Sequence, residues 1–416
     1  MSKVLVTAIG VGIPDTGADE AQDIKHRRQY RKATYVIEGK EYTTQFIAEA
    51  LIKHFQIDRV FMVGTAKSMW EQVYYSFTDN DRDDDYYLNL GDAIDRSKYD
   101  DYHFDQSYLH QVEEALDRKL GSSGSRCFLI KYGLNDEELL ENFQVFLQIA
   151  DLLQPQDEVY VDITHSFRSL AIFQYMMTSF IENLEDKQIK IRIYYGMLDL
   201  TREMGKAPVV DLTMINELNH WIKGIYELEH YGNGYLVADL IENIDEDLGK
   251  NIRDLSDRIN INFLKDIRRE RGQALWQHLR KIPGPGGFAT KNIHRFLRLF
   301  SKQQDESGFQ LQVARWFFEK RRYAAGYITL AEALVTRACE VLGYDFRIYE
   351  ERKRARNRMC DINKEYRELY DAVNEIRRMV AHFLGGSSDR YRTAIDKCFE
   401  YCDKAEKLFQ KIGIEF

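Results

Sequence analysis

Five short apolar runs in the first half of the chain, separated by stretches of helical periodicity, constrain its fold more than any other feature. The runs cover residues 3–10, 59–65, 126–133, 158–164 and 190–198. Between them, helical spacing of apolar residues occurs over 43–55, 136–152 and 167–185. Strands that are apolar on both faces and alternate with helices form parallel sheets covered on both sides. We therefore predict an α/β, Rossmann-like domain over residues 1–215.

The second half contains no apolar run with the character of a strand and is predicted to be all-helical. Residues 216–300 are expected to form a helical connector. A hinge is predicted at 283–287, because Pro283 and Pro285 alternate there with glycines, a pattern that neither a helix nor a central strand tolerates. Residues 301–416 are predicted to form a C-terminal helical bundle.

Composition excludes several classes of protein. Hydrophobic residues make up 44% of the chain and aromatic residues 13%, which favours folded domains over disorder. The five cysteines show no CxxC pair, so we expect free thiols in a reducing cytoplasm, with no bound metal and no cofactor. The amino terminus does not resemble a signal peptide. The longest apolar stretch, 169–181, is shorter than a membrane span, so no membrane partner is expected.

Charge is distributed unevenly along a chain whose net charge is −9. Residues 79–105 hold ten Asp against three cations, whereas residues 265–322 hold fourteen Lys and Arg against five acidic residues. The basic segment permits a polyanionic partner in the second half of the chain. The other interpretation is an ordinary solvated helix face.

Three of the predicted strands are followed at once by small or polar residues. These are Gly10 after the first strand, Gly64, Thr65 and Ser68 after the second, and Thr164, His165, Ser166 and Arg168 after the fourth. In an open parallel sheet, ligands bind where strands end and helices begin. Glycines let the backbone approach a ligand, helix N-termini bind anions, Arg168 suits a phosphate and His165 suits a base. The sequence therefore predicts a pocket for a nucleotide-like anion.

Two other interpretations of this cluster are open. Thr164 or Ser166 caps the helix that follows, which would explain one hydroxyl group but not the whole cluster. A dinucleotide-dependent oxidoreductase is the second interpretation. Against it, Gly10 and Gly12 lack the third glycine of the dinucleotide fingerprint, and the acidic residue expected after the next strand is not evident.

Segment 361–383 has the strongest helical periodicity in the chain. Its apolar residues, spaced by alternating steps of four and three, are Ile362, Tyr366, Leu369, Val373, Ile376, Val380 and Phe383. Such a stripe packs against the core of a bundle. The opposite face carries Arg367, Tyr370, Asn374, Arg378 and Ala381, and it is flanked by Arg377 and His382.

This polar face suits the cleavage of RNA. The ribose 2′-hydroxyl is a built-in nucleophile, so cleavage needs a proton shuttle and a cation beside the phosphate but no metal. His382 suits the first task, and Arg377 suits the second, with Asn374 beside it. Five residues apart on a helix, the pair is separated by about 140° and about 7.5 Å. Two pairs related by a twofold axis would grip one phosphate better, so we expect a homodimer. Simple solvent exposure of His382 is the other interpretation.

At this point the sequence resembles a known family. Arg377-x-x-x-x-His382 resembles the Arg-x4–6-His signature of HEPN ribonucleases. The loops 64–70 and 162–170 resemble those of the CARF domains in type III CRISPR ancillary proteins. A CARF domain followed by a C-terminal HEPN domain is the layout of the Csx/Csm-type ribonucleases, and the resemblance covers residues 1–215 and roughly 300–416.

The resemblance implies a switch. A cyclic oligoadenylate, with four adenylates favoured over six, would bind across the twofold axis of the CARF dimer. Its contacts would fall on Gly64, Thr65, Ser68, Thr164, His165, Ser166 and Arg168. Arg377 and His382 of the HEPN dimer would then cut single-stranded RNA without metal, leaving a 2′,3′-cyclic phosphate and a 5′-hydroxyl. Arg378 departs from the family pattern, in which this residue is often uncharged or acidic, and leaves open which arginine matters more.

Two further hypotheses remain. The chain would be a regulatory module if its CARF sensor were joined to a catalytically silent helical domain. The sheet domain would also degrade its own activator if His165 or Arg168 contributed to that reaction, although no sequence feature singles this out. The sequence leaves open the RNA sequence preference and whether dimers associate further.

Overall fold

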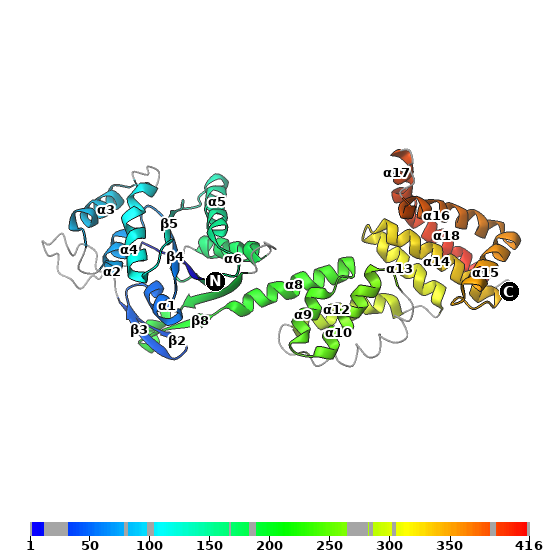
Figure 1. Ribbon diagram of the computed structural model, residues 1–416, viewed down its shortest axis with the longest axis horizontal. Coiled ribbons are helices and arrows are strands. Elements are labelled where there is room, and N and C mark those ends of the chain that lie inside the picture. The colour runs from blue at the N-terminus through cyan, green and yellow to red at the C-terminus, as the bar shows by residue number, and fades with distance from the viewer. Residues whose placement is uncertain are drawn as a thin grey trace. The chain divides into compact units, whose positions relative to one another are not determined.

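The computed structural model describes residues 2–11, 32–78, 82–97, 104–165, 168–182, 189–263, 282, 286–301, 305–382 and 388–413 (Figure 1). The chain divides into two compact units, Met1–Asn216 and Glu217–Phe416. Among the described residues, no helix combines the length and the apolar character that crossing a bilayer requires.

The described residues of the first unit form an eight-stranded sheet whose strand order is β3-β2-β8-β7-β6-β1-β4-β5. The strands are β1 Lys3–Ala8, β2 Ala33–Ile37, β3 Lys40–Thr44, β4 Arg59–Gly64, β5 Arg126–Leu129, β6 Glu158–Asp162, β7 Lys190–Gly196 and β8 Ala207–Asp211. The five strands expected from the sequence are β1, β4, β5, β6 and β7, and they are adjacent and parallel. The prediction of an α/β unit on a mostly parallel sheet is therefore confirmed.

Three strands at the other side of the sheet were not predicted. β2 and β3 form an antiparallel hairpin that turns at Glu38 and Gly39, both with positive φ, and β8 runs antiparallel to β7. β3 is rich in polar residues, as edge strands often are, and its sequence KEYTT carries no apolar run. Its last two residues were assigned to the helix expected over 43–55, which begins only at Ile47.

Helices cover both faces of the sheet. They are α1 Ile47–Phe55, α2 Trp70–Phe77, α3 Asp84–Arg96, α4 His110–Leu120, α5 Asp136–Leu152, α6 Arg168–Glu182 and the short α7 Thr201–Met204. Because side chains alternate along a strand, Val4 and Val6 of β1 pack in one apolar cluster with α5 and α6. Leu5 packs in another with α1, α2, α3 and α4. All three side chains are completely buried, which explains why these strands are apolar on both faces.

In the second unit every described element is a helix. α8 Thr213–Tyr231 begins in the first unit, and it is followed by α9 Tyr235–Glu242, α10 Glu246–Asn260, α12 Gly286–Ser301, α13 Glu306–Glu319, α14 Tyr323–Leu342, α15 Tyr349–Ile362, α16 Lys364–His382, α17 Ser388–Asp396 and α18 Cys398–Ile412. One apolar core joins α8, α9, α10, α12 and α13, and a second joins α13 with α14 to α18. α13 serves both, since Trp316 belongs to the first core and Phe318 to the second.

The predicted hinge at 283–287 is only partly visible, because residues 283–285, including Pro283 and Pro285, lie outside the described residues. Gly286 and Gly287 are not part of a loop, since they open α12. A Cβ at position 286 would lie 2.2 Å from Cγ2 of Ile282, so this helix start needs a glycine for close packing. Most of the predicted basic segment up to residue 285 also lies outside the described residues.

Candidate functional site

The first group of predicted site residues follows the carboxyl ends of three neighbouring parallel strands, β1, β4 and β6. These strand ends and the loops after them form the strand edge. β1 lies between β6 and β4, with Thr7 opposite Asp162 on one side and Met62 on the other. Gly64 is the last residue of β4, and Gly10 follows β1 by two residues. The strand ends that precede Gly10, Thr65 and Thr164 are therefore neighbours.

The loop after β4 is held together by its own hydroxyl groups. The backbone N–H of Thr65 donates to Ser68 Oγ at 2.9 Å, and Ser68 Oγ donates to the carbonyl of Ile9 at 2.9 Å. Both side chains are only 1% exposed. A Cβ at Gly64 would lie 2.7 Å from Ile9 and 2.8 Å from Trp70, so the loop tolerates no side chain there. Thr65 and Ser68 thus fix the shape of the strand edge rather than project from it.

The carboxylate of Asp162 organises the loop after β6. It accepts hydrogen bonds from the hydroxyl of Thr7 at 2.6 Å and from the backbone N–H of Thr164 at 2.9 Å. The hydroxyl of Thr164 in turn accepts from the N–H of Gly196 at 2.7 Å. Thr7, Asp162 and Gly196 were not among the residues predicted from the sequence. A buried Asp at the end of an apolar strand was the signal that could have found them.

His165 lies in this loop, and its imidazole ring is largely buried. Its Nε2 atom is buried and has no hydrogen-bond partner among the described residues. Burial lowers the pKa of His165, and the negative charge of Asp162 opposes this effect. Burial likewise raises the pKa of Asp162. A neutral imidazole with an unused nitrogen is suited to hydrogen bonding with a neutral group such as a base.

The remaining residues of this cluster are only partly placed. α6 begins at Arg168, whose side chain lies outside the described residues, as does the whole of Ser166. Since the hydroxyl of Thr164 accepts from β7, it does not cap α6.

The second predicted site lies on α16, and its helix begins later than expected. α15 ends at Ile362, and Asn363 starts a new helix by accepting the N–H of Tyr366 at 2.8 Å through its side chain. Ile362 is therefore 52% exposed, and its assignment to the core stripe was wrong. Tyr366, Leu369, Val373 and Ile376 are buried as predicted, Val380 packs partly buried against the same core, and Phe383 lies outside the described residues.

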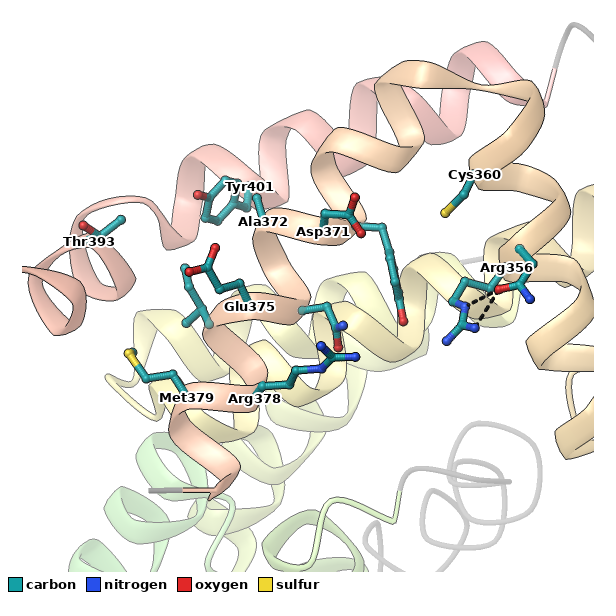
Figure 2. A pocket seen from close by; sticks show the side chains of 13 residues that line it. Arg356, Cys360, Asp371, Ala372, Glu375, Arg378, Met379, Thr393 and Tyr401 are labelled. Carbon is teal, nitrogen blue, oxygen red and sulfur yellow. Dashed lines mark hydrogen bonds between the residues drawn. The ribbon is translucent and has the colours of Figure 1, made fainter. Parts of the chain in front are cut away.

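The polar face of α16 borders two hollows. The smaller one, of about 220 Å³, is lined by Arg377 and Asn374 of α16 together with α14 and α15. The larger one, of about 650 Å³, is lined by Arg378 and also by Asn374, with Asp371 and Glu375 nearby (Figure 2). Arg377 and Arg378 thus face different hollows, and Asn374 reaches both. His382 is the last residue of α16, and its side chain lies outside the described residues.

Arg356 of α15 lines both hollows, although it was not among the residues predicted from the sequence. Figure 2 shows it on α15, across the larger hollow from Arg378 on α16. The signal was the run RKRARNR at 352–358, in which five of seven residues are cationic. A charge run alone does not tell which of its members faces a site.

Metal ligands are not clustered in the part of the chain that the structure describes. No group of three or more His, Cys, Asp or Glu side chains is placed there to hold an ion. All five cysteines are free thiols, and burial raises the pKa of Cys127, Cys402 and Cys339.

Two parts of the chain match models of known protein families. Residues 5–196 match the model described as CRISPR system endoribonuclease Csx1, CARF domain. Residues 217–307 match the model of the second domain of CRISPR-associated protein MJ1674. The N-terminal half is therefore a CARF domain of the Csx1 type, in a chain similar to CRISPR-associated proteins. The expected CARF resemblance is confirmed, whereas the HEPN assignment of residues 301–416 stays a prediction.

The relatives include one curated protein and one solved structure. CRISPR-associated protein MJ1674 of Methanocaldococcus jannaschii is 34% identical over 404 residues, which cover 92% of this chain and 62% of the relative. The chain thus spans less than two thirds of the length of that protein. The structure of Enterococcus italicus Csm6 bound to cyclic hexa-2′-fluoro-hexa-dAMP aligns with a TM-score of 0.42 and 11% identity, covering 100% of this chain and 95% of that one.

Proposed function

We propose that the protein is a ribonuclease activated by a cyclic oligoadenylate, which its CARF domain binds. The observation that carries the catalytic part is that Arg377 and Asn374, selected by helical spacing, line the same hollow. The CARF match over residues 5–196 supports the sensing part. A nucleotide-like activator also suits a strand edge that carries Gly10 and the unused ring nitrogen of His165.

Exposed apolar stripes support a homodimer. Along α6, Ile172, Met176 and Phe180 recur every four residues and are 62%, 51% and 43% exposed. Residues spaced by four lie on one helical face, so they form a continuous apolar surface. It starts just after the polar loop of His165. If a second copy covers this surface through a twofold axis, the two polar loops approach each other and together bind one ring.

Exposed apolar side chains also support pairing of the C-terminal bundles. Tyr391 and Ile395 on α17, which are spaced by four, and Phe399 at the start of α18 are exposed. Thr393 and Tyr401 of the same helices line the larger hollow beside α16. A partner bundle on this surface would therefore lie close to the polar face of α16.

The proposed reaction is an internal transesterification. A neutral His382 accepts the proton of the 2′-hydroxyl as its oxygen forms a bond to phosphorus. The bond from phosphorus to the 5′-oxygen breaks, and a protonated His382 of the second copy gives that oxygen a proton. Arg377 of each copy stabilises the charge on the phosphate. The products are a 2′,3′-cyclic phosphate and a 5′-hydroxyl.

The test is RNA cleavage by the full chain, in excess chelator, titrated with a panel of cyclic oligoadenylates. We expect activity with the cyclic tetra-adenylate, with the hexa-adenylate as the alternative. His382→Ala should lower it by about 100- to 10,000-fold. His110→Ala changes a well exposed histidine of α4 and serves as the matched control.

Cleavage that His382→Ala leaves unchanged would show that the catalytic assignment is wrong. Activator binding without any RNA cleavage would favour a sensor with a silent helical domain. Failure of every ring to bind would refute the sensing role.

A further inference from the structure

The smaller hollow beside α16 is more basic than a catalytic arginine alone requires. Its lining includes Lys353 and Arg356 of α15 in addition to Arg377. It also includes Arg352, whose charge is balanced by an ion pair with Glu332. Lys353, Arg356 and Arg377 have no such acidic partner among the residues that line this hollow. Three uncompensated cations in one small hollow indicate a polyanionic ligand.

Arg356 is available to such a ligand. Its guanidinium makes two hydrogen bonds to Asn357 Oδ1, at 3.1 and 2.6 Å, and lies 5.8 Å from the ring centre of Tyr370. Within the described part of the chain, no carboxylate forms an ion pair with it. An amide oxygen and an aromatic ring orient the guanidinium without neutralising its charge.

The basic helix α15 presents its cations in different directions. At about 100° per residue, Lys353 and Arg356 share one side of the helix, which borders the hollow. Arg354 and Arg358 are exposed and line neither hollow described here. Tyr349, at the start of the helix, is 74% exposed and also lines the smaller hollow. The lining therefore combines phosphate-binding cations with an aromatic ring on which a base can stack.

The acidic residues indicate which hollow the strand follows. Asp371 and Glu375 line the larger hollow but not the smaller one (Figure 2). In the larger hollow the two carboxylates offset the charges of Arg356 and Arg378, whereas cations outnumber carboxylates in the smaller hollow. A polyanion is therefore attracted more strongly on the side of α15. A strand that reaches Arg377 along the attractive side passes Arg356.

We propose that Lys353 and Arg356 form a subsite for RNA phosphates next to the scissile one, and that Arg356 is a positioning residue. This proposal rests on the proposed ribonuclease function. The subsite binds the phosphate backbone irrespective of base and thereby brings the neighbouring phosphodiester to Arg377. It would act chiefly on RNA affinity rather than on the chemical step.

The experiment measures affinity separately from cleavage. The probe is a fluorescent single-stranded RNA with 2′-fluoro groups, which cannot react through a 2′-hydroxyl, and it is titrated with the full chain over a salt series. Arg356→Ala should weaken binding about tenfold. It should also reduce the slope of log affinity against log salt by about 0.7, as expected when one phosphate contact to a single strand is lost. Arg358→Ala removes the same charge from the same helix and should change affinity less than twofold.

Two further measurements define the role. With cleavable RNA, Arg356→Ala should raise KM and leave kcat within a few-fold of the wild type, and Arg356→Lys should restore part of the affinity. Equal thermal unfolding of the Arg356 and Arg358 variants would exclude misfolding as the cause.

The possible outcomes distinguish failure of the RNA subsite from failure of the ribonuclease proposal. Equal affinities and equal salt slopes for the Arg356 and Arg358 variants would overturn the subsite even if the protein cuts RNA. Absence of any RNA binding would overturn it as well. Binding that depends on Arg356, without cleavage by the activated wild type, would refute the ribonuclease proposal and with it the positioning role, and would leave Arg356 only a contact to bound RNA.

Discussion

The strand edge of the CARF domain and the smaller hollow beside α16 use polar residues in opposite ways. This hollow forms a groove between α15 and α16. At the strand edge, Thr65, Ser68 and Asp162 are buried and hydrogen-bonded to their own surroundings. In the groove, Arg356 and Arg377 line an open hollow without a carboxylate partner of their own in it. The polar groups of the strand edge form internal hydrogen bonds, whereas the cations of the groove are not fully balanced by carboxylates among its lining residues.

This difference indicates how a signal would pass between two such sites. A loop fixed by internal hydrogen bonds offers its ligand a preformed surface, and a ligand adds little reorganisation there. A groove of unbalanced cations is complete only when an anion binds. If ligand binding at the strand edge controls the groove, it would do so by changing what binds beside the groove, for example a partner copy. The residues of the groove itself would not need to rearrange.

The largest effect expected within this comparison tests whether Arg377 and Arg378, which line different hollows beside α16, are equivalent. Arg377→Ala should reduce activator-dependent cleavage by about 100- to 1000-fold under single-turnover conditions, as the loss of a group that stabilises the transition state does. Arg378→Ala should reduce it less than tenfold, because Arg378 lines the larger hollow beside Asp371 and Glu375. The reverse order would move the catalytic cation to the larger hollow and break the contrast between the two sides of α16.

A smaller effect tests whether the strand edge is fixed in shape. Gly64→Ala places a Cβ within 3 Å of Ile9, Trp70 and Ser68. It should weaken activator binding by about tenfold and lower the free energy of unfolding by about 1–3 kcal/mol. Gly91→Ala in α3 is the matched control, because a Cβ there meets no atom within 4 Å. Calorimetric titration with cyclic tetra-adenylate measures the affinity of each variant, and urea unfolding measures its free energy of unfolding. Equal affinities would mean that this loop does not form part of the ligand site.

The strand edge could be predicted from the sequence because it follows from topology. Parallel strands end at one edge, so Gly10, Gly64 and Thr164 had to follow neighbouring strand ends once their strands were recognised. The hydrogen bond between Thr65 and Ser68 could not be predicted in this way. It depends on how a short loop closes, which the apolar pattern does not specify.

In the helical half, the spacing of apolar residues predicted which side chains of one helix are buried. It did not predict where one helix ends and the next begins. It placed Tyr366 and Val373 in the core but could not separate Ile362 from the same stripe, because the break at Asn363 preserves the spacing. The position of Arg356 in the site could not be predicted from the sequence for a related reason. Its position beside Asn374, eighteen residues later, depends on how α15 packs against α16.

The smallest expected effect tests the buried state of His165 through pH. Burial lowers the folded-state pKa of His165 below its unfolded value of about 6.5. Its contribution to stability is therefore complete above about pH 6.5 and is lost as the pH falls, when the unfolded chain binds a proton that the folded chain does not. The raised pKa of Asp162 acts in the opposite direction, since it favours the folded state as the pH falls.

The variant His165→Asn separates the contribution of His165 to the pH dependence of stability from that of Asp162. His165→Asn keeps Asp162 but removes the imidazole, so the wild type should lose more free energy of unfolding than the variant between pH 7.5 and pH 5.5. We expect a difference of about 1 kcal/mol, since one proton gives at most about 1.4 kcal/mol per pH unit. Urea unfolding at the two pH values measures it, with His110→Asn as the exposed control. If His165→Asn and His110→Asn behave alike, His165 is solvated. The strand edge would then hold a solvated polar side chain, as the groove does, and the contrast between the two regions would fail at this residue.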